Sequence, residues 1–407
     1  MTSGIRVALL STALALIAGP TFAGNGPAEA DSDVPPLVVD ESAGDWVVDR
    51  FAGNSTAGYA FTQGPARECG GVGRPAVAVA PDGTVYLATG GMSWLKDAIV
   101  RVGPDSNLRL LAGGGSSLAD GPAARARIAV DWRGGGLVWS NKDRSLYFVH
   151  PTIPAVRRLY SKDGQWFVES VAGNPEKTGI EDGPAKAALF GEPRSLAATA
   201  DGTIYVLDGN VLLRRIQNGQ VSTLVKFAGG PEVVDGPLAK ATFSLTNMSG
   251  QIAPGESDDV LYIADHWHFA ARRIDLKAMT ATRVAGMLKP AGKTAREQRF
   301  NGNHDGPALS WASFNSGCAY VCWDPVHQAL WCGGPDEHRM RWLREGSLRT
   351  VIGAKTGPWA QDEMGIPADK PRFNWGNVAA VDRQGRIYIT MPGAGVWRAY
   401  NVKEVKP

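Results

Sequence analysis

Four sequence features recur six times in the same order, and this repetition constrains the fold more than any other property of the chain. An aromatic residue follows a turn, an apolar segment with arginine comes next, a strand-like run ends in Ala-Gly or a variant, and a Gly-Pro turn follows. Short apolar runs separated by turns such as Asp201-Gly202 and Asn218-Gly219 are typical of antiparallel strands in tight hairpins. The recurring aromatics are Tyr86, Tyr147, Tyr205, Tyr262, Trp331 and Tyr388.

The phase of the repeat predicts a closed ring. The chain starts with a closing strand at 46–53, before any opening strand, and ends after the sixth basic strand at 396–402. The first strand can therefore complete the last sheet, which pairs the two ends and removes a weak seam in a ring of radial sheets. We expect an all-β fold over residues 45–407, a six-bladed β-propeller with four-stranded antiparallel blades. The sixth Gly-Pro turn is degenerate, at Ile366-Pro367.

The first residues carry a pattern typical of export. Arg6 is followed by an apolar run at 7–18 and by Thr21-Phe22-Ala23, so 1–23 is predicted to be a secretory signal peptide. Residues 24–44, rich in Gly, Pro, Ala and acids, are expected to form a flexible lead-in. The mature protein is then secreted or periplasmic. No later run approaches the roughly 20 apolar residues that an integral membrane segment needs.

Charge argues against a nucleic-acid partner. The formal net charge is +2, from 42 Lys and Arg against 40 Asp and Glu, and the basic residues are scattered along the chain. Nucleic-acid binding needs a clustered basic surface instead. The expected partners are a small-molecule or glycan ligand, or another protein.

Four cysteines in an exported chain allow disulfides. Cys322 and Cys332 flank a predicted hairpin around Asp324-Pro325 and are expected to face each other across it. Cys69 and Cys318 both lie near the start of an innermost strand. We predict one structural disulfide and leave the second pair open.

The blade from Asp182 to Gly229 carries the segments DGPAKAALF, DGTIYVLD, RRI and VSTL in that order. This pattern resembles the NHL-repeat propellers, a family related in architecture to the TolB-like and SMP-30-like six-bladed folds. The resemblance covers roughly residues 45–407. It implies the six-bladed fold and leaves the activity open, because propellers of this kind include scaffolds, receptor domains and enzymes.

Two groups of enzymes with a similar fold offer a comparison. Peptidylglycine-amidating lyases place zinc-binding histidines where innermost strands begin, and no histidine occupies those positions here. SMP-30-like lactonases hold a divalent cation with Glu, Asn and Asp. Glu192, Asn247 and Asn377 fall in similar regions, but their spacing matches no recognisable motif.

Most histidines fall in loops at one end of the predicted ring, called the top face, where the innermost strands begin. Imidazoles can ligate metals or move protons near neutral pH, so a divalent cation is the candidate cofactor. His266-Trp267-His268 is either a ligand pair or a surface turn, and Asp208 and Asp265 are expected mainly to organise turns. The candidate metal ligands are His150, His266, His268, His304 and His338.

Basic, amide and aromatic side chains are predicted at the top mouth of the channel. Arginines there can bind carboxylate or phosphate groups, or can instead pair with neighbouring acids such as Glu192. Tryptophans can stack on a sugar or anchor a partner, and the long loop 287–303 is a candidate lid. The predicted ligand-binding residues are Arg74, Arg133, Arg194, Asn247, Trp267, Trp375 and Asn377. The arginine pairs of the third strands are interpreted as structural.

These residues support three hypotheses. The leading one is an exported recognition module that binds an anionic or carbohydrate-like ligand, or a protein partner, at the top mouth. The alternative is a metal-assisted lyase or lactone hydrolase that uses the top-face His and carboxylate residues. A purely structural interaction module is the third. The sequence contains no nucleophile elbow, P-loop or HExxH motif.

Overall fold

A computed structural model of the chain describes residues 45–53, 63–70, 75–89, 97–130, 135–209, 211–245, 250–286, 304–314, 317–334, 337–354, 366–370, 372–373, 376–391 and 395–404. These ranges lie within the compact unit Leu37–Pro407. The predicted signal peptide 1–23, the lead-in 24–44 and the candidate lid 287–303 lie outside them.

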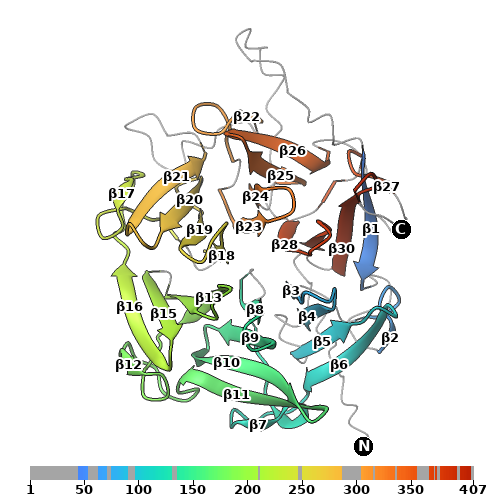
Figure 1. The fold of residues 1–407 in the computed structure, drawn as a ribbon, viewed down its shortest axis with the longest axis vertical. Coiled ribbons are helices and arrows are strands. Elements are labelled where there is room, and N and C mark those ends of the chain that lie inside the picture. Colours follow the sequence, from blue (N-terminus) through green and yellow to red (C-terminus); the bar gives the residue numbers. More distant parts are fainter. Residues whose placement is uncertain are drawn as a thin grey trace, which may run out of the picture. The chain divides into compact units, whose positions relative to one another are not determined.

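The described residues form six antiparallel sheets arranged as the blades of a propeller, which confirms the predicted fold class (Figure 1). The first blade contains, from the axis outward, β3 (Ala76–Val79), β4 (Val85–Thr89), β5 (Ala98–Val102), β6 (Asn107–Gly113) and β2 (Gly64–Pro65). The second contains β8 (Leu137–Ser140), β9 (Ser145–His150), β10 (Ile153–Lys162), β11 (Gln165–Gly173) and β7 (Gly121–Pro122), preceded by the 3₁₀ turn η2 (Ala123–Arg125). The third contains β13 (Pro193–Ala198), β14 (Ile204–Asp208), β15 (Leu212–Gln217), β16 (Gln220–Lys226) and β12 (Gly183–Pro184).

The remaining three blades repeat this order. The fourth contains β18 (Ile252–Pro254), β19 (Val260–Asp265), β20 (Ala270–Asp275), β21 (Thr280–Ala285) and β17 (Gly236–Pro237). The fifth contains β23 (Tyr320–Asp324), β24 (Ala329–Gly333), β25 (Arg339–Arg344), β26 (Ser347–Gly353) and β22 (Gly306–Pro307). The sixth contains β28 (Asn377–Val381), β29 (Ile387–Met391), β30 (Gly395–Asn401), β1 (Trp46–Ala52) and β27 (Ile366–Pro367).

The fifth strand of each blade corrects the expectation of four. It is the Gly-Pro segment that the sequence pattern presents as a turn, and it pairs over two residues with the outermost long strand, as Gly183 does with Val221. In five blades the glycine takes a φ between +121° and +151°, which side chains with a Cβ rarely adopt. Proline fits at this edge because it has no N–H to donate. The short segment thereby covers part of an edge that would otherwise stay open.

Six buried apolar clusters join neighbouring blades in a closed cycle within the described chain. The cluster between the first two blades, for example, contains Tyr86 and Ile99 of one and Phe148 and Leu159 of the other. Neighbouring innermost strands also contact each other around the axis, including β28 and β3. Each sheet is therefore covered on both faces by its neighbours, which a single blade could not achieve.

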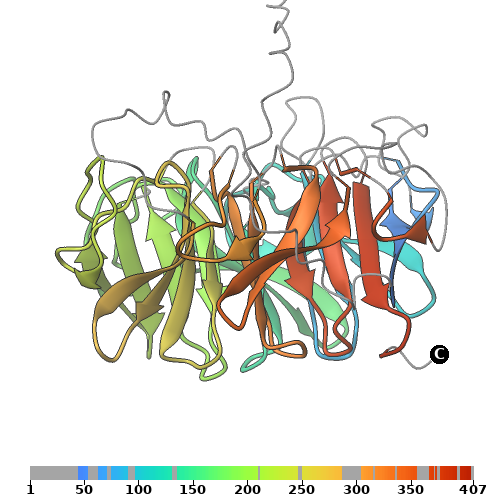
Figure 2. The ribbon, with the colours of Figure 1, turned by 90° about the horizontal axis from the view of Figure 1, so that it is seen from above.

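The two ends of the described chain close the ring, as the phase of the repeat predicts. Strand β1 pairs with β30 in antiparallel register from Trp46 opposite Asn401 to Ala52 opposite Val396. The sixth blade therefore contains the first and the last long strand of the chain (Figure 1). Figure 2 shows the sheets edge-on, with the strands running between two faces. Among the described residues no helix is long and apolar enough to cross a membrane.

The predicted disulfide between Cys322 and Cys332 is absent. In the antiparallel register Cys322 lies opposite Trp331, while Cys332 lies opposite Val321. Since side chains alternate between the two faces of a sheet, the two thiols point to opposite faces. Burial raises the pKa of both thiols to about 12, so they stay protonated and act as small apolar side chains.

A histidine links the fifth blade to the first strand and to the C-terminal end of the described chain. It lies on the bottom face, where the innermost strands end. His327 lies in the turn between β23 and β24, with its two ring nitrogens 2.6 Å from Asp324 Oδ2 and 2.7 Å from Glu404 Oε2. Its ring packs against Trp46 of the first strand at a centroid distance of 5.3 Å. Burial opposes protonation of the imidazole, but hydrogen bonds and charges from Asp324 and Glu404 outweigh it and raise its pKa.

The Glu404→Gln variant tests this closure through pH. Because the folded pKa of His327 is raised, its stabilising contribution is complete below the ordinary histidine pKa of 6.5 and is lost as the pH rises through the raised value. We expect the substitution to lower the free energy of unfolding by about 1 kcal/mol in mild acid and by clearly less in alkali. Denaturant unfolding across this pH range measures the difference, and a difference independent of pH would contradict the account.

Candidate functional site

The five candidate metal-binding histidines lie in separate surroundings. His150 Nδ1 is 2.7 Å from Thr152 Oγ1. His304 stacks on Trp311 at a centroid distance of 5.3 Å, and His338 Nδ1 lies 3.2 Å from the carbonyl oxygen of Phe373. Throughout the described ranges, which include all five histidines, no three His, Cys, Asp or Glu residues come together as a metal site.

The segment His266-Trp267-His268 is a turn after β19, one of the two forms that the sequence allowed. His268 is buried, with Nδ1 2.9 Å from Asp265 Oδ2 and Nε2 2.9 Å from the carbonyl oxygen of Gly230. Both of its ring nitrogens are therefore engaged within the blade. Trp267 points outward and is 45% exposed.

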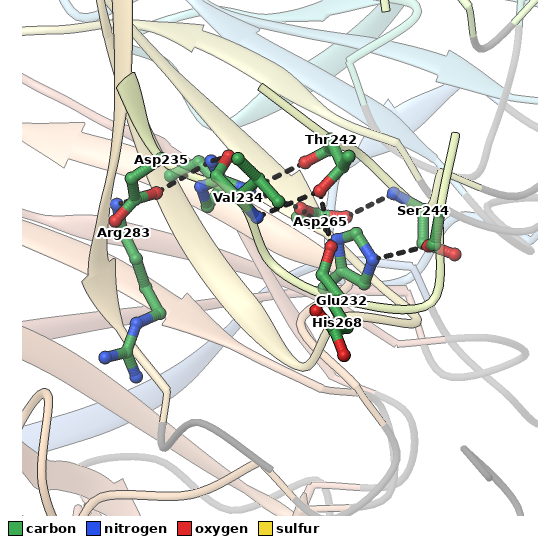
Figure 3. Close-up of polar contacts among 10 residues, drawn as sticks. Glu232, Val234, Asp235, Thr242, Ser244, Asp265, His268 and Arg283 are labelled. Atoms are coloured by element: carbon green, nitrogen blue, oxygen red, sulfur yellow. Dashed lines mark hydrogen bonds and ion pairs between the residues drawn. The ribbon is translucent and has the colours of Figure 1, made fainter. Parts of the chain in front are cut away.

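Asp265 organises the top of the fourth blade (Figure 3). One of its carboxylate oxygens accepts a hydrogen bond from the backbone N–H of Ser244 at 2.7 Å. The other lies 2.9 Å from His268 and 3.1 Å from the guanidinium of Arg272. Asp265 and Arg272 are both fully buried. This carboxylate therefore joins the end of β19, the middle strand β20 and the loop before β18.

The same arrangement recurs in the neighbouring blades. Arg214 donates hydrogen bonds to the carbonyl oxygens of Leu189 and Glu181 and forms ion pairs with Asp182 and Asp208 at 2.8 and 3.2 Å. Three of these arginines also lie over a phenylalanine ring, 4.3–4.9 Å from its centroid. The first arginine of these third strands is thus structural, as interpreted from the sequence. The four that are fully buried are Arg157, Arg214, Arg272 and Arg341.

Replacing the buried carboxylate should be far more damaging than replacing a half-buried one. We expect Asp265→Ala to lower the free energy of unfolding by about 4 kcal/mol, because it leaves the buried guanidinium of Arg272 with one acceptor fewer. Asp275→Ala removes a half-buried carboxylate at the end of β20 in the same blade and should cost about 1 kcal/mol or less. Denaturant unfolding of both variants measures the two losses of free energy of unfolding. Equal losses would show that the buried network contributes no more than the half-buried carboxylate.

A cavity of about 510 Å³ lies at the axis of the ring and is lined by residues of all six innermost strands. Its wall is largely apolar, with small side chains such as Ala78, Ala198 and Ala379. Two tryptophans face it, Trp139 on β8 and Trp323 on β23. These two strands belong to the second and fifth blades, which lie on opposite sides of the axis (Figure 1).

Each of these tryptophans is held by a tyrosine of the preceding blade. Trp139 stacks on Tyr86 with ring centroids 5.3 Å apart and planes 10° apart, and Trp323 stacks on Tyr262 at 5.8 Å and 17°. The indole of Trp139 also donates a hydrogen bond to Asn141 Oδ1 at 3.1 Å. The cavity therefore has two aromatic walls in fixed orientation.

Each innermost strand pairs with another strand along one edge only. The backbone N–H and C=O groups on its other edge therefore need partners from the neighbouring blades. Three hydrogen bonds supply them between the second and fifth blades. The backbone N–H of Leu196 donates to the carbonyl of Gly135 at 2.6 Å, and that of Ile252 donates to Ser195 Oγ at 3.0 Å. The N–H of Val321 donates to Gln251 Oε1 at 3.4 Å.

Asn377 holds the corresponding position at the start of β28. Val378 pairs with Ile389 as Ile252 pairs with Ile263, which places Asn377 in the same strand position as Gln251. Its side-chain Oδ1 is buried and has no hydrogen-bond partner among the described residues, and the residue lines the cavity. A buried carbonyl oxygen without a donor is costly, so this wall of the cavity presents an unused acceptor.

The seven predicted ligand residues have different outcomes. Asn377 lines the axial cavity. Arg194 lies at the start of β13 with a guanidinium nitrogen 2.7 Å from Glu192 Oε2, the pairing that the sequence left open. Trp267 lies on the outside of the fourth blade's top turn. The other four lie outside the described residues and are Arg74, Arg133, Asn247 and Trp375.

The ligand residues predicted from the sequence do not include the aromatic walls of the cavity, Trp139 and Trp323. A signal was available, because both tryptophans occupy the same strand position, opposite Leu330 and Leu146 respectively. Aligning the innermost strands by this register would have placed both side chains at the bottom end of the channel.

Gly135 allows the close approach of three blades beside the cavity. Its φ is +78°, and a Cβ at this position would overlap the hydroxyl of Ser195 and press on the side chain of Gln251. Gly135→Ala should therefore lower the free energy of unfolding by about 3 kcal/mol, through backbone strain and overpacking together. Gly164 has a similar φ of +76° with open space around it, so Gly164→Ala should cost about 1 kcal/mol. Equal losses on denaturation would contradict the proposed contact.

A scan against protein-family models and a search of curated proteins each returned no match. Solved structures show the fold. A protein of unknown function from Bacteroides thetaiotaomicron aligns with a TM-score of 0.59 at 13% identity, covering 88% of this chain and 76% of its own. Auxiliary nutrient-binding proteins from Bacteroides thetaiotaomicron and Bacteroides ovatus align with TM-scores of 0.56 at 12% and 13% identity, each covering 87% of this chain and 76% of their own. The chain is thus a six-bladed β-propeller by fold.

Proposed function

We propose that this propeller is a binding module that takes a small neutral saccharide or similar polyol in its axial cavity. The observation that carries the proposal is the composition of the cavity wall, where two fixed indoles oppose each other and a buried amide oxygen lacks a donor. The proposal keeps the predicted carbohydrate-like ligand and places it along the axis of the ring.

The size of the cavity suits a small ligand. Its volume of about 510 Å³ falls within the several hundred cubic ångströms that are usual for small-molecule sites. Such sites combine apolar walls with a few convergent polar groups. Here the polar groups include the amides of Asn141 and Asn377, which can exchange hydrogen bonds with hydroxyl groups.

The aromatic walls favour a ring-shaped ligand with apolar faces. A sugar ring carries C–H groups on its faces and hydroxyls at its rim. It could therefore lie against the indoles of Trp139 and Trp323 while its hydroxyls reach the amides. The unused Oδ1 of Asn377 accepts and cannot donate, so a ligand hydroxyl satisfies it directly.

Names of similar structures agree with a binding role. Two of the propellers with a TM-score of 0.56 are described as auxiliary nutrient-binding proteins. At 12–13% identity this likeness shows the fold alone, so the ligand is argued from the cavity of this chain.

Binding can be measured with a panel of neutral mono- and disaccharides, by thermal shift and then by calorimetry. A ligand that binds the folded state raises the melting temperature in proportion to its concentration over Kd. We expect at least one sugar of the panel to bind. Asn377→Ala should weaken the binding of that sugar about tenfold, since it removes one buried hydrogen bond.

A second variant fills the cavity. Ala379→Phe places a ring in the space that the ligand needs, and it should abolish binding while the protein stays folded. Ala278→Phe, on an exposed turn of the fourth blade, adds the same ring elsewhere and should leave binding unchanged. Absence of binding by every sugar, or binding that both Asn377→Ala and Ala379→Phe leave intact, would overturn the proposal.

A further inference from the structure

A second cavity, of about 640 Å³, opens on the bottom face between the first two blades. It is separate from the top-face residues that the sequence singled out. Turns of three blades border it, and they contribute Pro81 and Asp82 from the first, Asn141, Asp143, Arg144 and Ser145 from the second, and Arg383 from the sixth. The hairpin of β10 and β11 contributes Tyr160, Ser161 and Trp166. We call this cavity the bottom groove.

Aromatic rings form one side of the bottom groove. The stacked pair of Tyr86 and Trp139 lies at its inner end, and Tyr160 and Trp166 lie at its outer end. Tyr160 is itself stacked on Phe167, with ring centroids 5.8 Å apart. Tyr86, Trp139 and Tyr160 are thus held by neighbouring rings, and fixed aromatic surfaces bind ligands with little loss of side-chain freedom.

The acidic residues of the bottom groove already have partners. Asp143 accepts hydrogen bonds from Tyr147 at 2.7 Å and Arg158 at 2.8 Å, and these bonds keep its pKa below the usual value although burial opposes them. Asp82 accepts from the backbone N–H of Thr84 at 2.9 Å. The carboxylates therefore organise the turns and are not poised to receive a cation.

Two arginines remain for a ligand. In the described part of the chain, no hydrogen bond or ion pair holds the exposed Arg144 or Arg383, which come from the turns of the second and sixth blades. Arg158, the third cation, is occupied by Asp143 and Glu169. Asp82 is the one groove carboxylate without an ion pair among the described residues, so the two arginines leave the bottom groove with a net positive charge. Guanidinium groups bind carboxylates through two parallel hydrogen bonds.

The backbone at Arg144 is unusual for an arginine. Its φ is +53°, in the left-handed region. The turns of the first, third and sixth blades carry glycines with positive φ, namely Gly83, Gly202 and Gly385. The fifth blade has Gln328 at the corresponding position with a φ of +51°, so two blades hold a residue with a Cβ there. Glycine avoids the strain of this conformation, which Arg144→Gly would therefore relieve.

We propose that the bottom groove is a second binding site, for an acidic saccharide. The sugar rings lie against the aromatic side, and Arg144 and Arg383 bind the carboxylates. The exposed hydroxyl of Ser161 and the amide nitrogen of Asn141 are available to the sugar hydroxyls. Trp139 and Asn141 also line the axial cavity, so they are left unchanged in the test.

Calorimetry with a short oligogalacturonate and with its methyl ester tests the proposal. The two probes have nearly the same shape and differ in charge, so we expect the acid to bind at least tenfold more tightly than the ester. Binding of the acid should weaken as salt increases, because exposed ion pairs are screened. Equal binding of the two probes, or no binding of either, would overturn the proposal.

Variants locate the binding. Arg144→Gly relieves the backbone strain while it removes the cation, so loss of binding in this variant cannot be assigned to unfolding if its melting temperature is maintained or raised. The double variant Arg144→Gly, Arg383→Gln should bind the oligogalacturonate at least tenfold more weakly. Lys142→Gln removes the same charge from the same turn outside the groove and should change affinity less than twofold. Equal effects of Lys142→Gln and the double variant would contradict the assigned contacts.

Discussion

The innermost strand of each blade is paired along one edge, and its other edge faces the axis of the ring. This edge presents backbone N–H and C=O groups that need partners. Between the second and fifth blades the neighbouring strands supply some of them, through the carbonyl of Gly135 and the side chains of Ser195 and Gln251. At Asn377 the corresponding side-chain oxygen has no partner among the described residues. The axial cavity is therefore bordered by one buried side-chain oxygen without a partner among the described residues, and the proposed binding site rests on it.

The rigidity of that cavity depends on contacts further out. Buried arginines such as Arg214 and Arg272 join the middle strand of a blade to the loop that leads into its innermost strand. Carboxylates such as Asp265 complete each network with backbone N–H groups. The top-face acids and His268, which suggested a metal site, are used to hold these loops. We propose ligand binding at the axis and in the bottom groove instead.

The sequence predicts the ring well because the repeat is local. The spacing of Tyr205, Arg214 and Gly183 within one blade marks the strands, and the early closing strand at Trp46 predicts the shared sixth blade. The sequence predicts the structure less well where strand register or a contact between distant residues decides it. The thiols of Cys322 and Cys332 are close in sequence, yet a shift of one residue in register places them on opposite faces. The Gly-Pro segments become strands only because an outer strand lies beside them.

The candidate site was predictable only in part, because contacts between distant residues decide which side chains line it. Asn377 was found because it begins an innermost strand, whereas Arg194 is held by Glu192 two residues away. Trp139 and Trp323 face the axis because a tyrosine of the preceding blade stacks on each, a contact between residues more than 50 positions apart. The bottom groove is formed by turns of three blades and could not be read from any one of them.

The most direct measurement is a crystal structure of the protein grown with a neutral sugar that raises its melting temperature. The account predicts density for the sugar in the axial cavity, between the indoles of Trp139 and Trp323, with a ligand hydroxyl within hydrogen-bond distance of Asn377 Oδ1. A sugar bound elsewhere, with the axial cavity holding only water, would contradict it.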